Sequence, residues 1–195
     1  WQHVRDMVDW LPKLGFNAYF IQFRDSYNFF QRWYEHELNP GWAGEEMTIE
    51  KAQDLTRRMR AEIKKRGLIL HLVGHGWTCE PFGIPGLGWD KQARSAPPDV
   101  AKYLAEVNGK RDFWKGVALD TNLCYSNPEV RRMVVDAVVA YARDHPNIDY
   151  LHFWLADGTN NNCECAECAR ARPSDFYVMM LNELDGRLSE AGLKT

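Results

Sequence analysis

Three cysteines, Cys163, Cys165 and Cys168, lie within six residues in a C-x-C-x2-C pattern. Thiolates at this spacing bind zinc, and a fourth ligand would come from Cys124 or Cys79 elsewhere in the chain. The alternative is that the five cysteines form two disulfides and leave one thiol, as in a secreted protein. Either interpretation makes the cluster structural. A catalytic zinc keeps an open position and usually has histidine ligands, and this loop contains no histidine.

One carboxylate, Asp157, directly follows the apolar segment 149–156 and precedes Gly158. A carboxylate at the end of a buried strand is partly desolvated, which raises its pKa and suits a general acid. We therefore predict that Asp157 is catalytic. The alternative is an Asx turn that only closes the strand, since Asp-Gly is a common turn pair.

Two other apolar segments also end in polar or glycine-rich sequence, at Arg24-Asp25 and at 74–77 (GHGW). Arg24 either clamps the carboxylate or hydroxyl groups of a ligand or pairs with a neighbouring aspartate. His75 lies between glycines that permit close approach of a ligand, although it is equally an ordinary loop histidine. We expect the following side chains from these loops to bind substrate: Arg24, His75, Trp77, Asn160 and Asn161.

The elements that must position these residues alternate between helix and strand. Apolar residues at helical spacing predict helices that end near Gly15, Gly67, His145 and Gly192, with helix starts at Thr48, around 126–129 and at Ser174. The strands are predicted at 17–23, 68–73 and 149–156. Helices between strands imply parallel strands and an α/β fold. The long Gly- and Pro-rich stretch 74–127 should be functional or hold short elements of its own.

A (β/α)8 TIM-type barrel and an open doubly wound sheet both fit this order. No nucleotide-binding glycine motif follows a strand. One face of the three strands is wholly apolar, whereas the other carries a polar residue at mid-height in each strand. A sheet covered by helices on both faces should be apolar on both. We therefore predict part of a larger barrel whose interior contains Gln22, His71 and His152. For the two histidines we favour a role as core residues with satisfied hydrogen bonds over a direct role in catalysis.

Composition narrows the class of protein. The chain has 195 residues and a net charge of −3, which gives no basic surface for nucleic acid. No apolar run reaches the ~20 residues of a membrane span. The sequence starts at Trp1 without a methionine, so we expect residues 1–195 to be a single domain cut from a longer protein. The many aromatic residues outside periodic segments either pack long loops or line a sugar-binding cleft.

The segments YLHFWLADGTNNNCECAECARARPSDFYVMMLNEL, LCYSNPEVRRMVVDAVVAYARDHPNIDY and GHGWT resemble the bacterial family called domain of unknown function 4838. Part of that family is grouped as glycoside hydrolase family 163, with endo-β-N-acetylglucosaminidase activity on N-glycans, and is distantly similar to glycoside hydrolase families 20 and 67. The resemblance implies a fragment around strands 2–4 of a catalytic barrel, and a secreted or periplasmic protein. Family 20 enzymes end their fourth strand in an Asp-Glu pair, where this chain has only Asp157. Weaker candidates for a second carboxylate are Asp25, Glu80 and Glu164.

Three functions remain open. The first is a glycoside hydrolase acting on glycans or polysaccharides, with no cofactor needed for catalysis and a structural zinc at the cysteines. The second is a carbohydrate-binding barrel without hydrolysis, which would not need Asp157. The third is a metal-dependent barrel hydrolase or lyase that uses the cysteine cluster. The expected partners are a carbohydrate substrate and the rest of the barrel.

Overall fold

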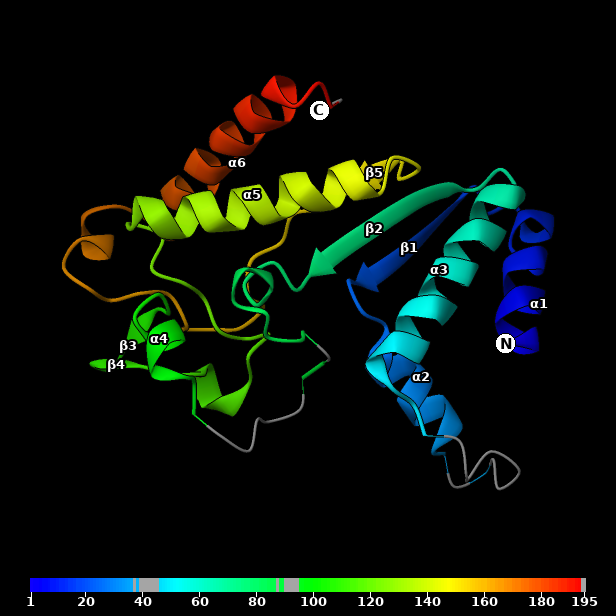
Figure 1. Ribbon diagram of the computed structural model, residues 1–195, viewed down its shortest axis with the longest axis horizontal. Helices are drawn as coiled ribbons and strands as arrows, with labels where there is room; N and C mark the ends of the chain where they lie inside the picture. The colour runs from blue at the N-terminus through cyan, green and yellow to red at the C-terminus, as the bar shows by residue number, and fades with distance from the viewer. Residues whose placement is uncertain (37, 39–45, 87, 90–94, 194–195) are drawn as a thin grey trace. The chain divides into compact units, whose positions relative to one another are not determined.

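The computed structural model describes residues 1–36, 38, 46–86, 88–89 and 95–193 (Figure 1). It is a mixed α/β structure in which the main sheet has three parallel strands in the order β1-β2-β5. The chain divides into two compact units, one of Trp1–Gly74 with Ile148–His152 and one of His75–Asn147 with Phe153–Thr195.

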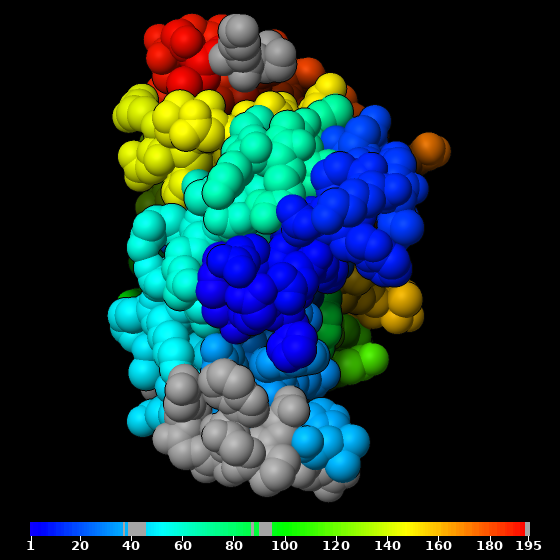
Figure 2. All heavy atoms as spheres, turned by 90° about the vertical axis from the view of Figure 1, so that its right-hand side faces the viewer, coloured from blue at the N-terminus to red at the C-terminus, as the bar shows by residue number. Residues whose placement is uncertain are grey.

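The first unit contains the sheet and the helices that precede its strands. In chain order its elements are α1 (Gln2–Trp10), η1 (Pro12–Leu14), β1 (Ala18–Phe23), α2 (Tyr27–Tyr34), α3 (Ile49–Lys65), β2 (Ile69–His75, whose last residue belongs to the second unit) and β5 (Tyr150–Leu151). Helix α3 packs against α1 and α2, and the surfaces of α1 and α3 lie side by side in Figure 2.

The ends of α3 follow the sequence pattern closely. Thr48 accepts a hydrogen bond from the backbone N–H of Lys51, and Gly67 after the helix has a positive φ of 69°. Apolar residues at helical spacing in this segment predict a buried stripe, and the structure buries all four of them: Ala52, Leu55, Met59 and Ile63. Helix α2 was not predicted from the sequence, although Tyr27, Phe30 and Tyr34 lie at helical spacing and face the core of the unit.

The two faces of the sheet differ as the alternation of side chains predicts. Ile21, Leu70 and Leu72 are buried, whereas Gln22 is exposed and His71 and His152 are half-buried. The described strands form an open sheet and not a closed barrel. The predicted position of Gln22, His71 and His152 inside a barrel is therefore not found in this chain, where they lie on the less buried side of the sheet.

Strand β5 is much shorter than the predicted 149–156. Its last ladder hydrogen bond runs from the backbone N–H of His152 to the carbonyl of Leu72, at 2.8 Å. Beyond it, side chains bond the backbone instead: the Tyr177 hydroxyl donates to the carbonyl of Phe153, and Asn122 Oδ1 accepts from the N–H of Ala156. An apolar run with strand periodicity thus leaves the sheet because other partners satisfy its polar groups.

The second unit contains the long segment between β2 and α5, and two long helices. Its elements are η3 (Glu80–Phe82), α4 (Pro98–Ala101), β3 (Glu106–Val107), β4 (Lys110–Arg111), η4 (Trp114–Gly116), α5 (Pro128–Asp144), η5 (Cys168–Arg170) and α6 (Pro173–Glu190). The prediction that this segment holds short elements is confirmed. Strands β3 and β4 form a hairpin through Asn108 and Gly109, both with positive φ, as a tight two-residue turn requires.

Helices α5 and α6 pack on each other in the second unit. Asn127 caps α5 by accepting from the N–H of Glu129, with Pro128 in the first turn, as the sequence predicts. The apolar pattern of this segment predicts that Tyr177, Leu181, Leu184 and Leu188 face inward. In the structure the buried residues of α6 are Phe176, Met180 and Leu184, so the prediction is right for Leu184 and wrong for Leu181, which is exposed. No helix in the described ranges is long and apolar enough to cross a membrane.

Candidate metal centre and acid–base cluster

Four cysteine thiols of the second unit converge on one point. The sulfur atoms of Cys124, Cys163, Cys165 and Cys168 all lie within 4.8 Å of one another. Cys124 Sγ is 3.7 Å from Cys165 Sγ and 3.9 Å from Cys168 Sγ. Tetrahedral zinc with Zn–S bonds of ~2.3 Å places its sulfur ligands ~3.8 Å apart. The four thiols therefore fit a tetrahedral thiolate site, of the type that takes zinc or iron.

The fourth ligand is Cys124, which lies just before α5. An antiparallel bridge between Leu104 and Leu123 fixes its backbone, and its N–H donates to the carbonyl of Tyr103 at 2.8 Å. The other sequence candidate, Cys79, is buried elsewhere in the unit, where burial raises the pKa of its thiol to about 12. All five cysteines are free, so the disulfide alternative is not found in this structure.

Polar groups around the thiols favour negative charge. The pKa of the Cys124 thiol is lowered to about 4. The largest cause is a hydrogen bond from Cys163, and hydrogen bonds from Ser126 and Arg111 act in the same direction, whereas desolvation opposes them. The backbone N–H of Glu106 donates to Cys163 Sγ at 3.3 Å. Such outer contacts orient metal-binding thiolates and offset their charge. A bound divalent ion would supply a cross-link between loops, because four protein ligands leave no open position.

A second polar cluster consists of His75, Asp120 and Asp157. His75 is 4% exposed, and this burial lowers its pKa although the charges of Asp157 and Asp120 oppose the shift. Burial raises the pKa of Asp120, and the negative charge of Asp157 raises it further. Asp157 itself is exposed, so the predicted desolvation at this position is not found. The partly desolvated environment that was expected for Asp157 is found instead at Asp120, a residue that the sequence pattern does not single out.

Aromatic rings surround the imidazole of His75. Trp89 and Trp154 both meet it edge-on, with ring centroids at 5.1 and 5.0 Å. Trp77 is fully buried and packs its ring against Tyr141 at 5.4 Å. This packing gives Trp77 a structural role in place of the expected contact with substrate.

Two buried amides hold the loop that carries Asp157. Asn161, 2% exposed, donates through Nδ2 to the backbone carbonyl of Asp120 at 2.7 Å. Asn122 accepts through Oδ1 from the hydroxyl of Tyr125 and the N–H of Ala156. The loop therefore lies against the segment that contains Asp120, which explains how two carboxylates 37 residues apart in the sequence influence each other.

The remaining candidates have partners of other kinds. Arg24 is half-buried in the first unit, where Asp25 is buried and accepts a hydrogen bond from Gln53 at 3.0 Å. Asn160 is exposed with a φ of 57°. Glu164 accepts from the backbone N–H of Asn108 and so contributes to the hairpin contact.

The sheet of the first unit carries a histidine pair. His71 Nδ1 lies 2.9 Å from His152 Nε2, so the two rings share a hydrogen bond. Tyr150 stacks on His71 at 4.7 Å and Phe20 contacts His152 at 4.6 Å. The shared hydrogen bond and these ring contacts give both imidazoles partners within the sheet.

No protein-family model matches the chain, and no curated protein matches its sequence.

Proposed function

We propose that this chain is part of a glycoside hydrolase-like catalytic domain that acts on glycans or polysaccharides. The observation that carries the proposal is the cluster of Asp120 and Asp157 beside His75, with two tryptophans around the imidazole. Hydrolysis of a glycosidic bond uses two carboxyl groups, one as an acid and one as a base or nucleophile. The sequence resemblance to domain of unknown function 4838 points to the same chemistry, including cleavage of N-glycans.

The two carboxyl groups differ in the way that such a reaction needs. Asp120 has a raised pKa because of its burial and the neighbouring negative charge, so it keeps a proton nearer to neutral pH. In the proposed reaction it donates that proton to the departing glycosidic oxygen. The exposed Asp157 is the second carboxylate, which activates water or attacks the sugar carbon. Neutral His75 positions the substrate by a hydrogen bond.

The fold is compatible with a part of a (β/α)8 barrel. The three parallel strands neighbour one another in the order in which they occur in the chain, and helices α1 and α3 precede β1 and β2. Consecutive strands are also neighbours in a barrel. The rest of the barrel would come from sequence outside residues 1–195.

The metal centre supports a structural role over a metal-dependent hydrolase. Its four thiols would fill all four positions of a tetrahedral site, whereas catalytic zinc sites keep one position for water or substrate. We propose that zinc here joins the loop 163–168 to the segment before α5, and through that loop stabilises the position of Asp157.

Activity of the full-length protein tests this proposal. Wild type, Asp120→Asn and Asp157→Asn are incubated with N-glycans and with plant and mucin polysaccharides, and released sugars are measured by mass spectrometry. We expect each substitution to reduce release by ~100-fold or more, whereas Asp185→Asn on the exposed side of α6 leaves it unchanged. Release that is equal in wild type and both cluster variants would remove the carboxylates from the mechanism.

A further inference from the structure

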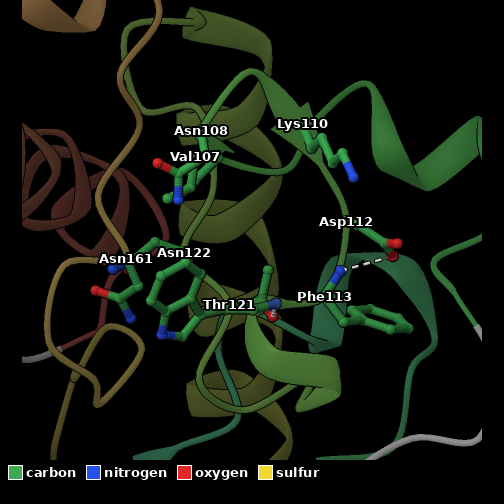
Figure 3. A pocket seen from close by; sticks show the side chains of 10 residues that line it. Val107, Asn108, Lys110, Asp112, Phe113, Thr121, Asn122 and Asn161 are labelled. Atoms are coloured by element: carbon green, nitrogen blue, oxygen red, sulfur yellow. Dashed lines mark hydrogen bonds between the residues drawn. The ribbon is translucent and has the colours of Figure 1, made fainter.

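A cavity of about 270 Å³ opens in the second unit between the β3–β4 hairpin, η4 and the segment that leads to Cys124 (Figure 3). Its size is near the lower end for small-molecule sites, which begin at ~300 Å³. The polar lining includes Thr121, Asn122 and Asn161, all of them at least 96% buried. Buried amide and hydroxyl groups at the edge of a cavity can form hydrogen bonds with a ligand without first losing hydrogen bonds to bulk water.

The two buried amides each have one bonding group in use and one left for a ligand. Asn161 uses Nδ2 to bond the carbonyl of Asp120, which leaves Oδ1 as an acceptor. Asn122 uses Oδ1 for Tyr125 and Ala156, which leaves Nδ2 as a donor. A donor and an acceptor on neighbouring walls match hydroxyl groups, which give and accept hydrogen bonds at once.

The rest of the lining adds an aromatic surface and balanced charge. Trp114 lines the cavity, and its backbone N–H donates to Thr121 Oγ1 at 2.8 Å, which ties η4 to the opposite wall. Lys110 and Asp112 also line it, with one positive and one negative charge. Asp112 accepts from the N–H groups of Phe113 and Ala96, the first of which is drawn in Figure 3. A neutral ligand with an apolar face suits this lining better than an anion does.

The metal centre supports two of the cavity walls. Asn122 and Asn161 each stand two residues before a metal-site cysteine, Cys124 and Cys163. The hairpin wall is joined to the same loop, because Glu164 donates its N–H to the carbonyl of Glu106 at 2.7 Å. In addition, the Glu164 carboxylate accepts from the N–H of Asn108 at 2.7 Å.

We propose that this cavity is a binding site for a single neutral, hydroxyl-bearing sugar ring, and that the tetrathiolate metal centre holds its walls in place. Asn122 and Asn161 bond the hydroxyl groups, and Trp114 provides the apolar contact. Asn161 also bonds Asp120, so a sugar held here is next to the acid–base cluster. The inference rests on the proposed function for the class of ligand, but binding of a free sugar requires no hydrolysis.

Binding measured by saturation-transfer NMR and calorimetry on the zinc-loaded protein tests the site. The probes are glucose and N-acetylglucosamine, with glucuronate and uracil as anionic and flat aromatic comparisons. We expect the neutral sugars to bind more tightly than either comparison probe. Trp114→Ala should weaken sugar binding about tenfold. Asn108→Gly, which keeps the positive φ of the turn, should weaken it about threefold. Trp10→Ala, at a tryptophan 60% exposed in the first unit, should leave it unchanged.

Chelation tests the link to the metal. Removal of zinc should weaken sugar binding while the helical circular dichroism signal of α5 and α6 is kept. Absence of sugar binding to the zinc-loaded wild type, tighter binding of uracil or glucuronate, or equal affinity in Trp114→Ala would overturn the site. Affinity unchanged by chelation would overturn its dependence on the metal. The same binding assay is run on the Asp157→Asn protein, which should lack hydrolysis but keep this cavity. Sugar binding by this variant therefore separates the failure of this site from the failure of the proposed hydrolysis.

Discussion

The side-chain amide of Asn161 donates a 2.7 Å hydrogen bond to the backbone carbonyl of Asp120, and so joins the loop after β5 to the segment before α5. Asn161→Ala removes this donor from a buried position. We expect the free energy of unfolding to fall by about 1–3 kcal/mol, measured by urea denaturation. The neighbouring exposed Asn160, replaced by glycine to suit its positive φ, is the matched control and should change stability by less than ~0.5 kcal/mol. Equal effects of the two substitutions would contradict this role for the Asn161 amide.

Two glycines make a matched pair for the packing of that same loop. A Cβ at Gly158 would stand 2.9 Å from Asn161 Nδ2, whereas a Cβ at Gly186 in α6 would meet nothing within 4 Å. Gly158→Ala must displace the Asn161 side chain, so we expect it to lower the unfolding free energy by about 1–3 kcal/mol. Gly186→Ala should raise it by up to ~1 kcal/mol, since alanine is the better helix former. Thermal unfolding of both variants shows whether each substitution raises or lowers the stability. Stabilisation by alanine at position 158 would show that the loop is loosely packed.

Metal content tests the thiolate centre. We expect one zinc per chain by plasma mass spectrometry, and a clear drop in the melting temperature when a chelator removes it, because the ion stabilises only the folded site. Cys165→Ser should lose the metal. Cys79→Ala, at a buried thiol outside the cluster, should retain it. Full metal content in Cys165→Ser, or a melting temperature indifferent to chelation, would argue against a tetrathiolate site.

The histidine pair makes stability depend on pH. Burial, and then the charge of His71, lower the pKa of His152. Between the unfolded value of ~6.5 and the lower folded value, the unfolded chain binds more protons than the folded one. The contribution of His152 to the unfolding free energy should therefore be highest above pH ~6.5 and fall as the pH is lowered, until it levels off below the folded pKa of this histidine.

Denaturation at a series of pH values measures this slope. The buried His75, whose pKa is also lowered by burial, contributes in the same direction. His152→Gln should therefore reduce the slope without removing it. A slope that is the same in wild type and variant would show that the pair does not carry the effect.

Local sequence determined much of the secondary structure. Thr48 was predicted to start a helix and caps it, a helix start was predicted around 126–129, and the alternation of Leu70, His71 and Leu72 assigned the faces of β2 correctly. These features depend on partners within about four residues, so the pattern along the chain contains the whole interaction. The C-x-C-x2-C loop was likewise recognisable as a metal-binding pattern before its geometry was known.

Tertiary structure decided which distant residues complete each site. The sequence pattern predicted Cys124 as the fourth thiol, with Cys79 as the alternative, and the tertiary structure brings Cys124 to the other three while a bridge between Leu104 and Leu123 fixes its backbone. Asp120 has no local motif that marks it, and its raised pKa comes from burial and from Asp157, which is far along the chain. Spacing reports contacts within one helix, strand or turn. The pKa of a carboxyl group depends on its burial and on nearby charges. In a long loop both are set by tertiary hydrogen bonds, such as the one between Asn161 and Asp120.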